Sequence, residues 1–257
     1  MMNRTFRLLK FSRQRAAENM AIDEAIFRLY TDSKQDTIRF YSWEPSAVSI
    51  GKHQSLNDEV QMNNLEKLGF DFVRRITGGG SVFHDANGEL TYSVVTNKEY
   101  LESEDLDASY YELSQMVFYP LENLGLEFDY NKIHCPSIFT KGKKISGNAQ
   151  ARSGDTILQH GTLLINYRPE IMYSVLKARP NRSTESMIKS VYQYVTTLNE
   201  KLNKNFTPLD VANYLQKELI DSEVIECFYG ELTSDERRLA QKLLLERYQS
   251  EDWLLSG

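Results

Sequence analysis

The sequence has few of the features that indicate a disulfide framework, a membrane span or a broad nucleic-acid-binding surface. Its two cysteines, Cys135 and Cys227, are far apart and show no metal-binding spacing, so a reducing compartment is expected. No apolar run approaches the length of a membrane-spanning helix, and no signal-peptide core follows the N-terminus. The net charge of −6 argues against binding nucleic acid through a basic face. A cytoplasmic protein is therefore expected.

The composition is that of a globular protein, with 41% hydrophobic and 26% charged residues in 257. We expect a single domain over 1–257, with a mainly helical tail from roughly 170 to 257. Hydrophobic spacing predicts helices at 19–30, 57–68, 107–124, 170–177, 208–220 and 235–247, and strands at 37–43, 47–51, 70–73, 90–95, 138–140, 144–152 and 156–166. The short separations favour hairpins, so the predicted fold is α/β or α+β, with a mixed, largely antiparallel sheet covered by helices.

A run of three glycines, Gly78, Gly79 and Gly80, marks the strongest candidate site. Glycine amides can approach a ligand closely, and successive N–H groups can converge on an anion. Arg75 precedes the run and His84 follows it, which adds a cation and a titratable imidazole. Glycines alone would also suit a tight turn, but with these neighbours a ligand site is favoured.

A second motif follows at 141–150 and contains Lys144. In an extended strand the Lys144 side chain shares a face with Ser146 and Asn148, so it could line the floor of a cleft. A lysine there can stabilise a phosphate or the oxygen of a reacting carbonyl. Arg74 is expected to point away from Arg75 and to make a structural ion pair.

Together these motifs resemble the lipoate-protein ligase and lipoyl (octanoyl) transferase family. The resemblance implies a class II synthetase fold like that of biotin-protein ligases, with a helical C-terminal cap. It covers nearly the whole chain and rests on motifs in one order, at 19–25, 49–54, 74–85, 144–150 and 159–161.

The resemblance implies, as the favoured function, ATP-dependent formation of lipoyl-adenylate and transfer to a lysine of a lipoyl domain. Such a ligase would use ATP and Mg²⁺, for which no ligand motif is present, and lipoate or octanoate. The acceptor would be a lipoyl domain of a 2-oxoacid dehydrogenase complex or the glycine cleavage H protein. By position, Lys144 would be catalytic, and the substrate and ATP would be bound by Arg75, Gly78, Gly79, Gly80, Ser81, Val82, Phe83, His84, Gly147, Asn148, Ala149 and His160.

Three alternatives stay open. The chain lacks the further C-terminal domain of stand-alone ligases, so it resembles the large subunit of a two-part ligase that needs a small accessory subunit. Cys135 precedes Lys144, as in octanoyltransferases and amidotransferases that form an acyl thioester without ATP, although those tend to have Arg where Gly80 stands. A non-catalytic lipoyl-binding relative would keep the fold and the pocket without turnover.

Overall fold

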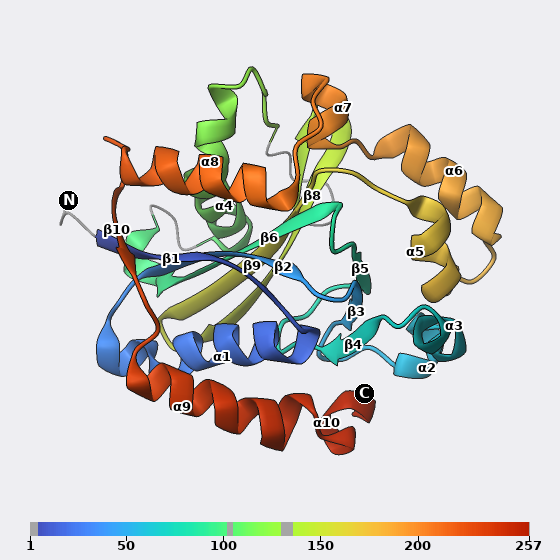
Figure 1. Cartoon of the computed structure of the whole chain (residues 1–257), viewed down its shortest axis with the longest axis horizontal. Helices are drawn as coiled ribbons and strands as arrows, with labels where there is room; N and C mark the ends of the chain where they lie inside the picture. Colours follow the sequence, from blue (N-terminus) through green and yellow to red (C-terminus); the bar gives the residue numbers. More distant parts are fainter. Residues whose placement is uncertain (1–4, 102–104, 130–135, 257) are drawn as a thin grey trace.

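The computed structural model describes residues 5–101, 105–129 and 136–256. Its centre is a seven-stranded sheet in the order β10-β1-β2-β6-β9-β8-β7 (Figure 1). The strands from β2 to β7 pair antiparallel, whereas β10, β1 and β2 are parallel, so the predicted mixed, largely antiparallel sheet is confirmed. The strands are β1 (Thr5–Gln14), β2 (Thr37–Trp43), β6 (Glu89–Asn97), β7 (Ser137–Thr140), β8 (Lys143–Ser153), β9 (Thr156–Leu164) and β10 (Glu226–Gly230).

A smaller sheet of three strands carries the glycine run. Strand β3 (Ala47–Ile50) lies between β4 (Asp71–Arg74), which is parallel to it, and β5 (Val82–His84), which is antiparallel. The segment 75–81 therefore crosses the end of β3 to connect β4 with β5, and we call it the triglycine loop.

Helices cover both faces of the large sheet (Figure 1). One face packs against α1 (Ala16–Ser33), beneath which lies α9 (Ser234–Leu243), and the other face packs against α4 (Leu106–Glu122) and α8 (Pro208–Ile220). The adjacent residues Leu8 and Leu9 point into these two different cores, as strand geometry requires. Helix α4 is continuous although it contains Pro120, because this proline lies in its last turn.

The predicted helix at 57–68 is divided into α2 (Leu56–Glu59) and α3 (Met62–Lys67). Val60 adopts an extended backbone conformation and bridges to Leu176, and this tertiary pairing interrupts the helix. A 3₁₀ turn, η1 (Lys98–Tyr100), follows β6. Among the described residues, no helix combines the length and apolar character needed to cross a membrane.

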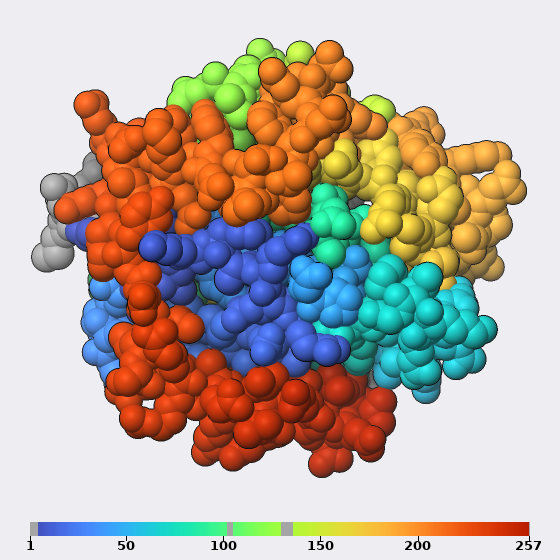
Figure 2. Space-filling view, viewed as in Figure 1, coloured from blue at the N-terminus to red at the C-terminus, as the bar shows by residue number. Residues whose placement is uncertain are grey.

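The C-terminal part is mainly helical, as expected, but it also supplies β10 at the edge of the sheet. Its remaining elements are α5 (Pro169–Val175), α6 (Thr184–Tyr194), α7 (Leu198–Leu202), the π-helical segment η2 (Leu244–Tyr248) and α10 (Glu251–Leu255). The space-filling view shows C-terminal segments on both sides of the N-terminal ones (Figure 2). Helices α5 and α6 stand at the other end of the sheet, beside β8 (Figure 1).

Candidate functional site

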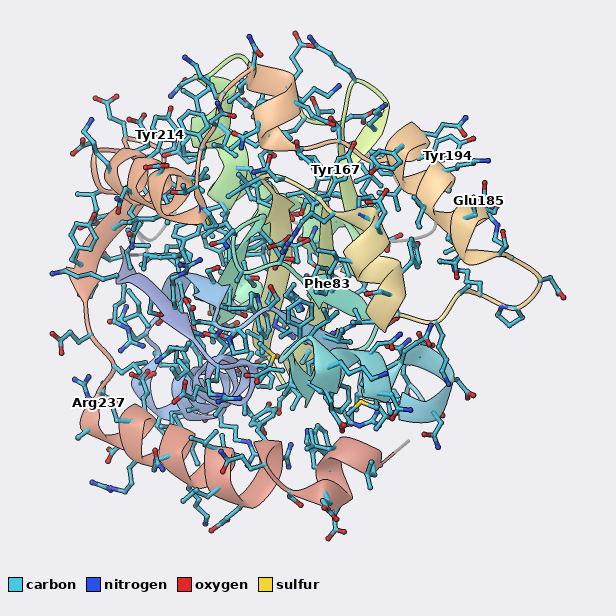
Figure 3. All side chains as sticks on the ribbon, turned by 45° about the vertical axis from the view of Figure 1, so that its right-hand side comes forward. Phe83, Tyr167, Glu185, Tyr194, Tyr214 and Arg237 are labelled. Atoms are coloured by element: carbon cyan, nitrogen blue, oxygen red, sulfur yellow. The ribbon has the colours of Figure 1, made fainter. Side chains whose placement is uncertain are left out.

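A cavity of about 730 Å³ lies between the triglycine loop, strands β8 and β9, and helices α5 and α6. In Figure 3, Phe83 lies near the centre of the view with Tyr167 above it, and Tyr194 lies on α6 to the right of Tyr167. The cavity is lined by Lys144 and by every predicted binding residue, namely Arg75, Gly78, Gly79, Gly80, Ser81, Val82, Phe83, His84, Gly147, Asn148, Ala149 and His160. Cys135 lies outside the described residues, but Pro136, which follows it, lines the cavity.

Arg75 organises the triglycine loop from within. Its Nη2 donates to the carbonyl oxygens of Gly78 at 2.8 Å and Gly80 at 2.7 Å, and its Nε donates to Thr77 Oγ1 at 3.1 Å. Its Nη1 donates to the carbonyl and the hydroxyl of Ser49. All five N–H groups of the guanidinium are therefore engaged in hydrogen bonds, an arrangement that could not be predicted from the sequence. Burial lowers the pKa of Arg75 to about 10.

This arrangement leaves hydrogen-bond donors in the loop. The carbonyl groups of Gly78 and Gly80 are satisfied within the protein, because both accept hydrogen bonds from Arg75. Within the described part of the chain, the N–H groups of Gly78, Gly79 and Gly80 have no acceptor. Adjacent free N–H donors beside a buried cation can stabilise an oxyanion or a phosphate oxygen.

His84 is held on three sides. Its Nε2 lies 2.8 Å from Ser49 Oγ, its Nδ1 lies 2.8 Å from Glu89 Oε1, and its ring stacks on Trp43 at 3.9 Å between centroids. Thr91 completes the arrangement, since it donates to Glu89 at 2.6 Å and accepts from Trp43 Nε1 at 2.8 Å. The imidazole therefore presents a fixed edge and face to the cavity.

His160 lies behind the loop. Its Nε2 is 2.8 Å from Thr77 Oγ1, and its Nδ1, 3.5 Å from Asp23 Oδ2, makes no hydrogen bond among the described residues. Burial lowers the pKa of His160, although Asp23 opposes this shift. Asp23 is itself paired with Arg39 at 2.8 Å. A neutral His160 is therefore expected at neutral pH.

Lys144 lines the cavity next to Gly147, and a Cβ atom at Gly147 would lie 3.1 Å from the Lys144 Nζ. Asn148 also lines the cavity, whereas Ser146 is fully buried and does not, so the predicted shared face is only partly correct. The reason is a β-bulge: Phe139 pairs with Lys144 but Ile138 pairs with Ser146, and the alternation is broken between them.

Gly161 allows β8 and β9 to approach each other at the cavity. It pairs with Asn148, and a Cβ atom at Gly161 would lie 1.9 Å from Asn148 Oδ1. The same Oδ1 accepts a hydrogen bond from Tyr92 at 2.8 Å. Glycine at this position therefore lets the Asn148 side chain lie across the neighbouring strand.

Arg74 differs from its prediction. It points away from Arg75, but its guanidinium donates to backbone carbonyl oxygens, including those of Gln54 at 2.6 Å and Leu254 at 3.1 Å, and forms no ion pair with any described residue. The sequence also gave no signal for several lining residues outside the motifs, of which Trp43, Tyr173, Arg179 and Arg182 are examples. Among the described residues, no cluster of His, Cys, Asp or Glu could hold a metal ion, so the structure assigns no Mg²⁺ ligands.

Comparison with known proteins matches residues 15–220 to the lipoyl protein ligase A/B catalytic domain. Octanoyltransferase LipM of Brevibacillus brevis is 31% identical to this chain, covering 93% of it and 94% of the relative. LipM of Bacillus subtilis is 28% identical to this chain, and the match covers 98% of this chain and 99% of that relative. Among solved structures, a chain from the bi-partite lipoate protein ligase and E2 lipoyl domain of Thermoplasma acidophilum has a TM-score of 0.85 at 26% identity, covering 99% and 97%. A lipoate-protein ligase A bound with ATP has a TM-score of 0.82 at 26% identity, covering 98% and 99%.

Proposed function

The chain belongs to the family of lipoyl protein ligase A/B catalytic domains, and from this we propose that it is an octanoyltransferase. It would take an octanoyl group from a carrier thioester and pass it to a lysine of a lipoyl domain. The observation that supports this most is the similarity to octanoyltransferases over nearly the full length of both chains. The ATP-dependent ligase favoured by the motifs is left unconfirmed, and ATP, Mg²⁺ and an accessory subunit belong to that competing hypothesis.

Cys135 is the nucleophile in this proposal. It directly precedes Pro136 in the sequence, and Pro136 lines the cavity. The carbonyl of Pro136 accepts a hydrogen bond from the Asn148 N–H at 2.9 Å, which anchors this wall. Cys227 is unsuited, because it lies in β10, does not line the cavity, and has its pKa raised to about 12 by burial.

The reaction would proceed in two acyl transfers. The Cys135 thiolate attacks the donor carbonyl, a C–S bond forms, and the donor thiolate leaves and takes up a proton. The acceptor amine then attacks the enzyme thioester, so that a C–N bond forms, the C–S bond breaks and the amine proton returns to the sulfur. In both steps the free N–H groups of the triglycine loop and the Lys144 ammonium would stabilise the negative oxygen.

The cavity also has a place for the acyl chain. Its deepest lining includes Met20, Tyr41 and Trp43, which are almost completely buried. An apolar end next to a polar centre suits a hydrocarbon chain that ends in a reacting carbonyl. His84, stacked on Trp43, would stand between the two parts.

The test is intact-protein mass spectrometry after incubation with octanoyl carrier protein. We expect an octanoyl adduct on the wild type and on Cys227→Ser, the matched control, and none on Cys135→Ser. Addition of a lipoyl domain should discharge the adduct. A Cys135→Ser protein that still lipoylates this domain with ATP and lipoate, together with a wild type that forms no adduct, would favour the ligase instead.

A further inference from the structure

The cavity is positively charged although the protein is acidic. The chain carries a net charge of −6, yet among the described residues five Lys or Arg side chains and two Asp or Glu side chains line the cavity. Two of the basic groups have structural roles, since Arg75 holds the triglycine loop and Arg168 pairs with Asp85 at 2.5 Å. Lys144 lines the cavity from β8, beside Gly147, and has the catalytic role proposed above. The remaining two, Arg179 and Arg182, need another explanation.

Arg179 and Arg182 stand at the exposed end of the cavity, on the connection between α5 and α6. Within the described residues neither guanidinium is paired with a carboxylate, and the neighbouring acid, Glu185, is paired with Lys189 at 2.9 Å. Tyr173 lines the cavity with both arginines; burial raises its pKa, and the charges of both guanidinium groups oppose this shift. Two uncompensated arginines therefore act on the same end of the cavity.

The wall next to these arginines is apolar. Met172 and Leu176 line the cavity from the α5 side, and Met187 and Val191 line it from α6. Leu176 and Met187 are buried, whereas both arginines are exposed. The lining of the cavity thus combines two exposed cations, an apolar wall from α5 and α6, and the polar groups of the triglycine loop.

We propose that Arg179 and Arg182 bind the phosphodiester of a phosphopantetheine arm that presents the acyl thioester. This inference rests on the proposed octanoyltransferase function. Such an arm has a phosphate at one end, a thioester at the other and an uncharged chain between them, and the lining of the cavity offers a group suited to each. Arginine binds phosphate oxygens in bidentate geometry, so two guanidinium groups that have no carboxylate partner among the described residues suit this anion. An incoming lysine carries no phosphate, so the pair would select the donor.

The test uses two small donors, octanoyl-phosphopantetheine and octanoyl-pantetheine, which differ only in the phosphate. For the wild type we expect kcat/KM for adduct formation to be roughly 10- to 100-fold higher with the phosphate, the effect of charge-assisted hydrogen bonds. In the Arg179→Gln/Arg182→Gln double variant this preference should fall close to one. The matched control is Arg237→Gln/Arg238→Gln, which removes the same charge from α9, far from α6 in Figure 3, and should keep the preference.

The outcomes separate this inference from its premise. A wild type that reacts with both donors at equal rates, or a double variant that keeps the preference, would overturn the arginine assignment alone. No adduct from either donor would overturn the octanoyltransferase proposal and this inference with it. If the double variant instead lowers ATP-dependent lipoylation, the phosphate belongs to a nucleotide and the inference is wrong.

Discussion

Gly51 shows how closely the site is packed at the residue scale. A Cβ atom at Gly51 would lie 2.3 Å from the carbonyl oxygen of Gly79, a backbone atom that cannot move without displacing the triglycine loop. Gly79 itself has φ of 92°, a conformation that favours glycine. By contrast, a Cβ atom at Gly78 would meet no atom within 4 Å. Gly51 is therefore required for the close approach of the triglycine loop, whereas Gly78 has room for a side chain, although both belong to the sequence motifs.

We predict that Gly51→Ala lowers the free energy of unfolding by about 1–3 kcal/mol, the usual cost of overpacking. Gly78→Ala, the matched control, should leave it nearly unchanged, since its added methyl group enters open space. Urea unfolding of the three proteins measures the difference. If Gly51→Ala were as stable as the wild type, the triglycine loop would be able to move away from Gly51 at little cost in free energy.

The residue types at the site were predictable from sequence, but their roles were not. The glycines, Arg75 and Lys144 were found as motifs because their spacing is local. The Arg75 guanidinium donates its hydrogen bonds within the protein, partly to the hydroxyl groups of Ser49 and Thr77. These hydroxyl groups come close to Arg75 only when the small sheet has formed. The stacking of Trp43 on His84 is also tertiary, and in sequence Trp43 is only the last residue of a strand.

At the scale of elements, one buried ion pair connects the first strand to a C-terminal helix. The Arg7 guanidinium of β1 makes two hydrogen bonds with the Glu236 carboxylate of α9, at 2.8 and 2.6 Å, and both side chains are buried. Glu236 also closes the capping box of α9 with Thr233. The ion pair therefore fixes the position of the first turn of α9 relative to β1.

We predict that Glu236→Ala destabilises the protein by about 3–5 kcal/mol, because it leaves a buried guanidinium without its counter-ion. The double variant Arg7→Met/Glu236→Leu removes both charges and should recover most of this loss. Thermal unfolding monitored by circular dichroism compares them. A double variant no more stable than Glu236→Ala would mean that the capping box, and not the ion pair, accounts for the effect.

The same pair gives a pH dependence with a definite sign. Burial alone would raise the pKa of Glu236, but the hydrogen bonds and charge of Arg7 lower it below its usual 4.5. A carboxylate with a depressed pKa in the folded state contributes stability above about pH 4.5, and this contribution is lost as the pH falls toward the folded value. As the pH falls below about 4.5, wild-type stability should therefore decrease more steeply than that of the double variant.

Most elements were predicted from hydrophobic spacing, and the misses have physical causes. The meander of β7, β8 and β9 was found because short hairpins leave local signals. Strands β1 and β10 were not predicted, because they pair in parallel with partners distant in sequence. The bulge in β8 was also invisible, since it depends on the register with β7.

At the scale of the whole molecule, the end of the described chain packs beneath the site. The Trp253 Nε1 donates to the Arg74 carbonyl at 2.9 Å, and the Arg74 guanidinium donates back to the carbonyl groups of Trp253 at 3.0 Å and Leu254 at 3.1 Å. Arg74 is fully buried and directly precedes Arg75, which holds the triglycine loop. Helix α10 is thus connected to the loop through two consecutive arginines.

We predict that Trp253→Ala lowers both the free energy of unfolding and the rate of octanoyl adduct formation. The first loss should be about 1–3 kcal/mol, because the buried Arg74 carbonyl loses its donor. The rate of adduct formation should fall because a shift of β4 would move Arg75. This rate should be measured well below the unfolding temperature of the variant, so that loss of folded protein does not contribute. Leu255→Ala, on the same helix but 61% exposed, is the matched control and should change neither quantity. If Trp253→Ala lost stability but kept the wild-type rate, α10 would support the fold without positioning the triglycine loop.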